Sequence, residues 1–161
     1  MQDEKMHTYS IEYGFNQPLA APANVAFEWC TDYQPHDLAI MKEKGKREIQ
    51  KITDGTIVLT ETTRRKNRVI KKTKLVRLNK SSLSWTNTHI AGPNRHSQFL
   101  YRIVAEGRKR SRLYFEGLLI LYSRKPLSRQ QLRKIARDER QGDATVWRHL
   151  ATALRKDTAQ R

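Results

Sequence analysis

Side chains that could donate or accept a proton occur in three separate segments of the chain. His89 lies in "SLSWTNTHI", Glu116 in "RLYFEGLLILY", and Glu139 and Asp143 follow in the C-terminal segment. A carboxyl or imidazole group inside a closed pocket has a shifted pKa, and such shifts are typical of catalytic acids and bases. These four residues are therefore the candidate acids and bases of the sequence.

The recognised motifs of metal binding and catalysis are absent. None of the histidines has a second His, a Cys or a carboxylate at a metal-ligand spacing such as H-E-x-x-H; they are His7, His36, His89, His96 and His149. "AGPN" (91–94) lacks the glycines and lysine of a phosphate-binding loop, and no G-x-S-x-G sequence occurs. We expect no metal and no cofactor, and the sequence assigns no catalytic residue.

The most basic stretch is "RRKNRVIKKTKLVR" (64–77), with eight bases in fourteen residues. The whole chain has 32 Lys and Arg against 16 Asp and Glu, a net charge of +16. Such an excess favours anionic partners, which include nucleic acid, acidic lipid surfaces and small anions. The candidate anion-contacting residues are Arg64, Arg65, Lys66, Arg68, Lys71, Lys72, Lys74 and Arg77.

The lysines of this stretch conflict with a strand that has one buried face. On a strand Lys71 points away from Lys72 and Lys74, so both faces carry charge. Either the start of the strand projects beyond the core, or one lysine reaches into a pocket, where it would suit a carboxylate or phosphate. A solvated strand with snorkelling lysine stems is the simpler interpretation. Nucleic-acid binding lacks a recognised motif, and contact with an anionic membrane remains open.

Length and composition indicate one domain of 161 residues. The single cysteine, Cys30, excludes an intrachain disulfide and is expected to be a small buried residue. No apolar run is long enough to span a membrane, and "MQDEK" does not resemble a signal peptide. We therefore expect a cytoplasmic protein.

Hydrophobic periodicity predicts seven strands and three helices. A strand covers 7–15 and is expected to stop at Pro18; two short helices follow, at 22–32 and 35–41. Period-two strands then run from Gly45 to about Tyr122, divided by turns such as Asp54-Gly55. A long amphipathic helix follows Pro126, with Ser128 as its N-cap, and its stripe must pack on the sheet.

This order of elements resembles the START-related superfamily (SRPBCC), which includes polyketide cyclase/dehydrase-like and pollen-allergen-like proteins. The local match is "APANVAFEWCTD", where Pro22, Val25, Phe27, Trp29 and Asp32 fill the pattern that follows strand one in that family. The resemblance implies an α+β helix-grip fold, in which a curved seven-stranded antiparallel sheet wraps around the C-terminal helix. One START-like domain would cover 1–161, with a core of about 7–157.

The family resemblance also implies a cavity between the sheet and the long helix, for a lipid, sterol, polyketide or other apolar molecule. Strand parity predicts that Phe99, Tyr101 and Ile103 share one face and that Leu113 and Phe115 share the next. Glu139, Gly142 and Asp143 interrupt the apolar stripe of the helix, which predicts either a kink or wetter segment, or polar groups in the cavity. The candidate ligand-binding residues are Trp85, Asn87, His89, Phe99, Tyr101, Ile103, Leu113, Phe115, Glu139, Asp143, Trp147 and Leu150.

Three functions remain compatible with these residues. The first is binding or transport of a hydrophobic or amphipathic small molecule, lipid-like and with an anionic group as one option. The second is a cyclase- or dehydratase-type enzyme with an acid or base in the pocket. The third is electrostatic binding of nucleic acid or an anionic membrane through the 64–77 segment, a contact that weakens steeply as salt is added.

Overall fold

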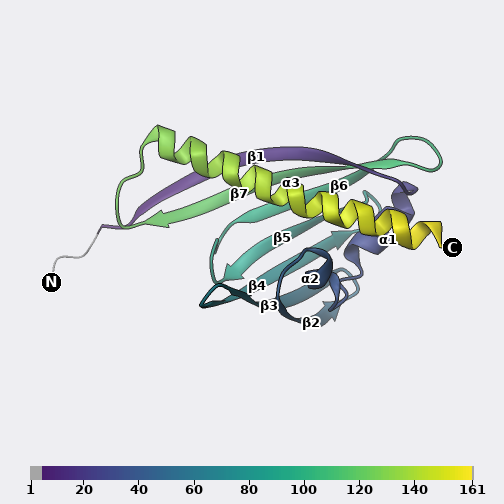
Figure 1. The fold of residues 1–161 in the computed structure, drawn as a ribbon, viewed down its shortest axis with the longest axis horizontal. Helices are drawn as coiled ribbons and strands as arrows, with labels where there is room; N and C mark the ends of the chain where they lie inside the picture. Colours follow the sequence, from purple (N-terminus) through teal and green to yellow (C-terminus); the bar gives the residue numbers. More distant parts are fainter. Residues whose placement is uncertain (1–4, 161) are drawn as a thin grey trace.

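A computed structural model describes residues 5–160, which form one antiparallel sheet and three helices (Figure 1). The strands are β1 (His7–Leu19), β2 (Gly45–Thr53), β3 (Thr56–Arg65), β4 (Arg68–Asn79), β5 (Ser84–Ala91), β6 (Gln98–Ala105) and β7 (Ser111–Ser123). The helices are α1 (Ala23–Thr31), α2 (Asp37–Ile40) and α3 (Arg129–Ala159). The predicted order of elements is confirmed.

The sheet has the strand order β1-β7-β6-β5-β4-β3-β2, and every neighbouring pair is antiparallel. Six strands follow one another along the chain, and the last of them, β7, pairs with β1, which leaves β1 and β2 as the edges. The sheet curves on the side where α3 crosses it, and α1 and α2 lie near the C-terminal half of α3 (Figure 1). The predicted helix-grip architecture is thus present.

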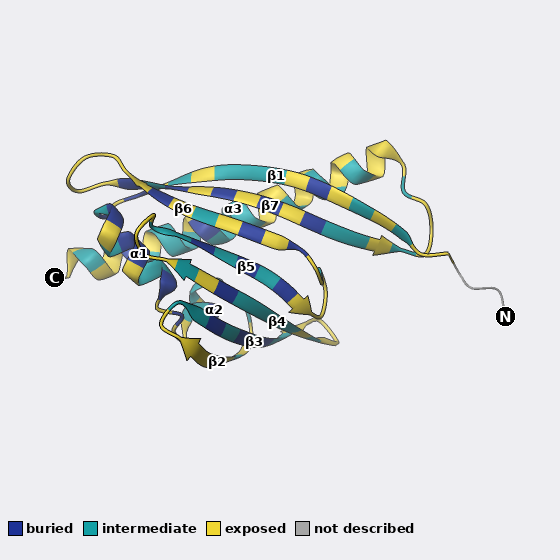
Figure 2. Ribbon diagram, turned by 180° about the vertical axis from the view of Figure 1, so that it is seen from behind, coloured by how far each residue is buried: buried dark blue, intermediate teal, exposed yellow. Residues whose placement is uncertain are grey.

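Alternation of side chains decides which residues can reach the concave face. Phe99 and Ile103 of β6 are buried and Tyr101 is half-buried, whereas Leu100 and Arg102 between them are exposed. Leu113 and Phe115 of β7 are buried in the same way. In Figure 2 buried residues alternate with exposed ones along much of β6 and β7, and with half-buried ones along β5. The predicted parity of these strands is confirmed, because burying the aromatic row fixes the register.

The expectation that Pro18 ends the first strand is wrong. β1 continues to Leu19, and Pro18 stands opposite Arg112 of β7. Because β1 is an edge strand, one side of it has no neighbouring strand, and a proline that lacks an N–H can be accommodated there.

The α1 helix closes one end of the sheet with small and aromatic side chains. Its buried residues are Ala23, Ala26, Phe27 and Thr31. Val25, Trp29 and Cys30 are only half-buried, so the expected burial of Cys30 is incomplete. The ring of Phe27 packs edge-on against Trp85 at 5.8 Å, and this contact joins α1 to the middle of the sheet.

The α3 helix is continuous through Gly142 (Figure 1). Arg140, Gln141 and Gly142 are exposed, as expected of a wetter helix segment, whereas Asp143 lines the cavity. Its N-cap is Ser128, as predicted, and a capping box pairs the Ser128 and Gln131 side chains with each other's backbone N–H. Trp147 and Leu154 are its buried anchors. Among residues 5–160, no helix is both long and apolar enough to cross a bilayer.

Candidate functional site

A cavity of about 220 Å³ lies between the sheet, the C-terminal half of α3 and the α2 region. Its wall combines aromatic rings from β5, β6, β7 and α3 with charged groups from β2, β3 and β4. The lining residues from α1, α2 and the segments beside them are Trp29, Cys30, Tyr33, Asp37, Leu38, Met41 and Glu43. The sheet contributes Arg47, Leu59, Glu61, Thr63, Arg65, Lys72, Lys74, Trp85, Asn87, Tyr101 and Phe115, and α3 contributes Asp143, Val146, Trp147 and Leu150.

The apolar wall is a packed set of aromatic rings. Trp85 and Tyr101 are directly opposite each other on β5 and β6, and their rings stack with centroids 4.9 Å apart and planes 4° apart. Trp147 of α3 completes the wall, with its ring centroid 6.3 Å from Trp85 and 5.6 Å from Tyr101. Together these three rings form the apolar part of the cavity wall.

Asn87 supplies amide groups between two tyrosine hydroxyls. The Tyr33 hydroxyl donates to Asn87 Oδ1 at 3.4 Å, and Asn87 Nδ2 donates to the Tyr101 hydroxyl at 3.5 Å. These bonds are at the long limit for hydrogen bonds. Burial raises the pKa of both tyrosines above the ordinary value, so both hydroxyls stay protonated and remain able to donate.

A tyrosine–carboxyl pair links β1 to α3 beside the cavity. The Tyr13 hydroxyl donates to Asp143 Oδ2 at 2.6 Å. Gly117 of β7 leaves room for the Tyr13 ring, because a Cβ at position 117 would lie only 3.0 Å from Tyr13 Cζ. Burial raises the pKa of Asp143, although the Tyr13 hydrogen bond and the charges of Lys72 and Lys74 oppose the rise. Burial and then the charge of Asp143 raise the pKa of Glu139 on the preceding helical turn.

Buried charges form a connected network on β2, β3 and β4. Arg47 Nη1 lies 3.0 Å from Asp37 Oδ2, and Arg47 Nη2 lies 3.2 Å from Glu61 Oε1. Lys74 Nζ reaches the same Glu61 carboxylate at 3.1 and 3.2 Å. Burial acts to raise the pKa of Glu61, but the charges and hydrogen bonds of Lys74 and Arg47 together outweigh it and lower that pKa.

Proteins of known structure share this architecture at low sequence identity. A START superfamily protein from Mycobacterium smegmatis is 13% identical, with a TM-score of 0.70, covering 90% of this chain and 97% of its own. The Zhui aromatase/cyclase from Streptomyces sp. R1128 is 19% identical, with a TM-score of 0.60. The match covers 92% of this chain and 90% of the aromatase/cyclase. Norcoclaurine synthase from Thalictrum flavum, solved with dopamine and hydroxybenzaldehyde, is 12% identical, with a TM-score of 0.67. The match covers 92% of this chain and 88% of the synthase.

The fold is the START-like helix-grip fold. The resemblance first seen in residues 21–32 and in the order of elements is therefore confirmed as a likeness of fold. A scan against family models found no match, and a search of curated proteins found no significant match. One fold supports many activities, so the helix-grip fold alone does not assign a function to this chain.

The structure brings seven of the twelve candidate ligand-binding residues to the cavity wall: Trp85, Asn87, Tyr101, Phe115, Asp143, Trp147 and Leu150. The other five do not line this cavity, and their contact with a ligand stays a prediction. Ile103 and Leu113 lie in the hydrophobic core near α1, and Phe99 lies in a second cluster with Ile11 and Leu119. Sheet parity identified the concave face, but it does not separate core from cavity wall on that face.

The remaining two, His89 and Glu139, lie outside the lining for different reasons. His89 is 5% exposed and packs edge-on against Phe99 at 5.0 Å, so neighbouring side chains enclose it. Glu139 is half-buried on α3, one turn before Asp143. Glu116, the fourth candidate acid or base, is exposed because its position on β7 points to the outer face.

The basic segment divides between the two faces of β4. Arg64, Lys66, Arg68, Lys71 and Arg77 are exposed, and their contact with nucleic acid or an acidic membrane stays a prediction. Lys72 and Lys74 share the inward parity of β4 and line the cavity. They are therefore not the surface residues of the predicted set, and they follow the other alternative, in which a lysine of this strand reaches into the pocket. Arg65 is exposed at the cavity edge and pairs with Glu43 at 2.5 Å.

Sequence reasoning missed Tyr13, Tyr33, Arg47 and Glu61. Glu61 had a detectable signal, because it continues the inward row of Ile57 and Leu59 and places a charge where an apolar residue is expected. The others had none. Tyr13 and Tyr33 meet partners 130 and 54 positions away, and the partners of Arg47 lie on α2 and β3, whose placement beside β2 no local pattern predicts. Among residues 5–160, no group of three or more His, Cys, Asp or Glu side chains is placed to hold a metal ion.

Proposed function

We propose that this protein binds a compact hydrophobic or amphipathic molecule, with an aromatic ring, in the cavity between the sheet and α3. The observation that carries the proposal is the wall of Trp85, Tyr101 and Trp147 next to polar groups from Asn87 and Asp143. A mostly apolar pocket with a few placed polar groups is the usual form of a small-molecule site. Norcoclaurine synthase, of the same fold, was solved with two small aromatic compounds.

Cavity size restricts the ligand. The volume of about 220 Å³ is below the roughly 300–1,000 Å³ of common ligand pockets. It exceeds the roughly 150 Å³ of an engineered cavity that binds benzene. One or two fused rings with a small substituent therefore suit this cavity better than a sterol or a long acyl chain.

Filling the cavity should weaken binding of a neutral two-ring dye such as prodan. Leu150→Trp puts an indole into the space beside Trp147 and should weaken binding of prodan about tenfold or more, measured by fluorescence titration. Leu100→Trp, on the exposed outer face of β6, is the matched control and should bind like the parent protein. Equal binding by both variants would place the dye elsewhere and contradict the proposal.

A second candidate function is proton-transfer catalysis of the cyclase or dehydratase type. The observation that favours it is the Tyr13–Asp143 pair, in which a hydroxyl orients a partly desolvated carboxyl beside the cavity. A carboxylate removed from water is a stronger base, and a positioned donor fixes its direction. The aromatase/cyclase of the same fold shows that the architecture can accommodate an enzyme.

Kemp elimination of nitrobenzisoxazole tests this candidate without knowledge of the natural substrate. In that reaction a base removes the ring proton and the N–O bond breaks to give a nitrile and a phenolate. Asp143→Asn should reduce the rate about tenfold or more, whereas Asp138→Asn, exposed on the same helix, should not. Because burial raises the pKa of Asp143, the rate should rise with pH around a midpoint above that of an ordinary aspartate. An unchanged rate in Asp143→Asn would exclude this base.

A further inference from the structure

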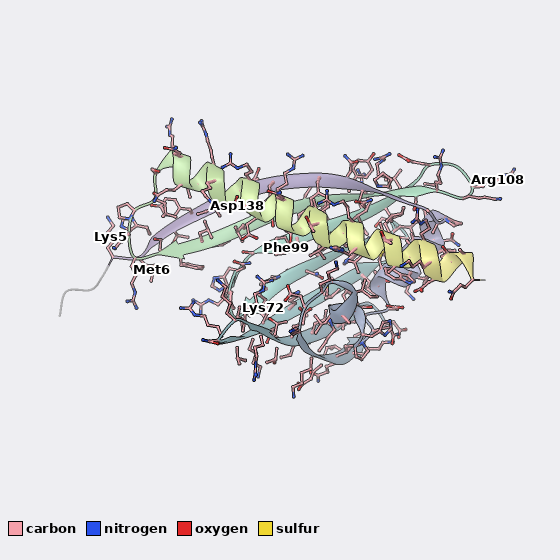
Figure 3. The ribbon with its side chains drawn as sticks, in the orientation of Figure 1. Lys5, Met6, Lys72, Phe99, Arg108 and Asp138 are labelled. Carbon is pink, nitrogen blue, oxygen red and sulfur yellow. The ribbon has the colours of Figure 1, made fainter. Side chains whose placement is uncertain are left out.

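Lys72 of β4, labelled in Figure 3, is one of the cations that line the cavity, and it differs from the other three. Among the described residues that line the cavity, Arg47, Arg65 and Lys74 each have a carboxylate within 4.0 Å, and Lys72 has none. Lys72 is half-buried and turns toward the cavity with the inward row of β4. Its ammonium group is therefore partly removed from water without an ionic partner in the protein.

Strand register explains why Lys72 lacks a partner. Glu61 of β3 is directly opposite Lys72, which is the position where an oppositely charged pair normally forms. The Glu61 carboxylate instead points to Lys74 and Arg47: Oε1 accepts from both, and Oε2 accepts from Lys74. The acid that faces Lys72 across the sheet is thus already engaged by two other cations.

The carboxyls of α3 do not replace Glu61. Glu139 and Asp143 are close enough for the charge of Lys72 to lower their pKa values, but neither forms an ion pair with it within 4.0 Å. Asp143 is already engaged by the Tyr13 hydroxyl at 2.6 Å. Burial, followed by the charges of Lys74 and Arg65, lowers the pKa of Lys72, as expected of an ammonium group without a counter-ion.

We propose that the ligand of this cavity is a compact aromatic carboxylate, whose ring lies against Trp85, Tyr101 and Trp147 and whose carboxylate pairs with Lys72 Nζ. The proposal rests on the proposed binding function and names the class of ligand. An anionic oxygen is the partner that a desolvated ammonium group lacks. A single negative charge matches the one unpaired cation, whereas a phosphate would add a second charge near Glu139 and Asp143.

Matched ligands and matched lysine variants test this inference. Calorimetric titration compares naphthalene carboxylate, naphthalene methanol and naphthyl phosphate. The parent protein should bind the carboxylate about tenfold or more tightly than the alcohol, the range of one charge-assisted hydrogen bond. Lys72→Met should remove that preference and still bind the alcohol. Lys72→Arg should keep it, and Lys71→Met, exposed on the opposite face of β4, should keep it as well.

The outcomes separate this inference from the binding function on which it rests. Equal affinity for carboxylate and alcohol, unchanged in Lys72→Met, would overturn the carboxylate proposal and leave the apolar cavity intact. Tighter binding of the phosphate than of the carboxylate would overturn the single-charge argument. Absence of binding of all three compounds to the parent protein would overturn the proposed function, and the inference with it.

Discussion

Replacing Arg47 by methionine should lower the free energy of unfolding by about 3–5 kcal/mol, the range for removing one partner from a buried ion pair. The Arg47 side chain is only 5% exposed and lies between Asp37 and Glu61. Methionine keeps the apolar stem but leaves Asp37 without a cation and Glu61 with Lys74 alone. Asp37 then stays partly buried without a cation and Glu61 keeps only one of its two, and this lost charge compensation is the source of the effect.

Arg47 also ties the α2 region to the sheet. Its guanidinium donates to the Gln34 backbone oxygen at 3.3 Å and lies 5.8 Å from the centre of the Tyr33 ring. Loss of these contacts should loosen the wall that α2 forms over the cavity, so ligand affinity should fall together with stability.

Urea unfolding of Arg47→Met and Lys46→Met measures the effect on stability. Lys46 precedes Arg47 on β2 but is 75% exposed, and its contact with Glu48 is 3.9 Å, so its replacement should change stability by less than about 0.5 kcal/mol. A loss below about 1 kcal/mol for Arg47→Met would mean that water compensates the network and that the pairs are effectively exposed.

Local patterns predicted most of the fold because each pattern has a local physical cause. The Asp54-Gly55 turn, the parity of Phe99, Tyr101 and Ile103, and the Ser128 cap all depend on residues near one another in the chain. The error at Pro18 has the opposite origin. Whether a proline is tolerated depends on whether its strand is at an edge, and the sheet order that decides this is not local.

The candidate site was less predictable because long-range contacts position its polar groups. Tyr13 and Asp143 are 130 positions apart, and the Tyr33–Asn87 contact spans 54. The sequence did indicate that a lysine of 64–77 could enter a pocket. Which of Lys72 and Lys74 forms an ion pair there depends on where the Glu61 carboxylate points. Arg47, on the β2 strand that has no recognised motif, binds that carboxylate together with Lys74.

Two charge systems with different physical roles meet on the concave face. The Arg47–Glu61–Lys74 network is internally compensated and stabilises the sheet near α2. Lys72 and Asp143 line the same cavity without an ion pair of their own, and this arrangement leaves them able to interact with a bound molecule. Lys74 belongs to the first system and Lys72 to the second, and the positive charges of both lower the pKa of His89.

Acidification should destabilise the protein between pH 6.5 and about 4, and His89 should account for about 3 kcal/mol of the loss. Burial, followed by the charges of Lys74 and Lys72, lowers the pKa of His89 to about 4. In the unfolded chain the imidazole binds a proton below about pH 6.5, while the folded chain keeps it neutral. The unfolded state therefore takes up more protons in this window, and stability falls as the pH falls.

The local contacts of His89 support a neutral ring. His89 is 5% exposed and packs edge-on against Phe99, and its Nδ1 atom has no hydrogen-bond partner among the described residues. A proton on that nitrogen would add a buried charge without an acceptor, opposite Lys74 in the strand register. The missing acceptor and the nearby Lys74 charge both disfavour the protonated ring, in agreement with the lowered pKa of His89.

Urea unfolding of the parent protein, His89→Leu and His36→Gln between pH 4 and 7 isolates this contribution. The difference in stability between the parent and His89→Leu should change by about 3 kcal/mol over the range, whereas His36→Gln, an exposed control, should follow the parent. NMR titration of the His89 imidazole supplies a direct check. A midpoint near 6.5 would show that the ring is hydrated and that the two lysines do not act on it, and the inward placement of Lys72 and Lys74 would then have to be revised.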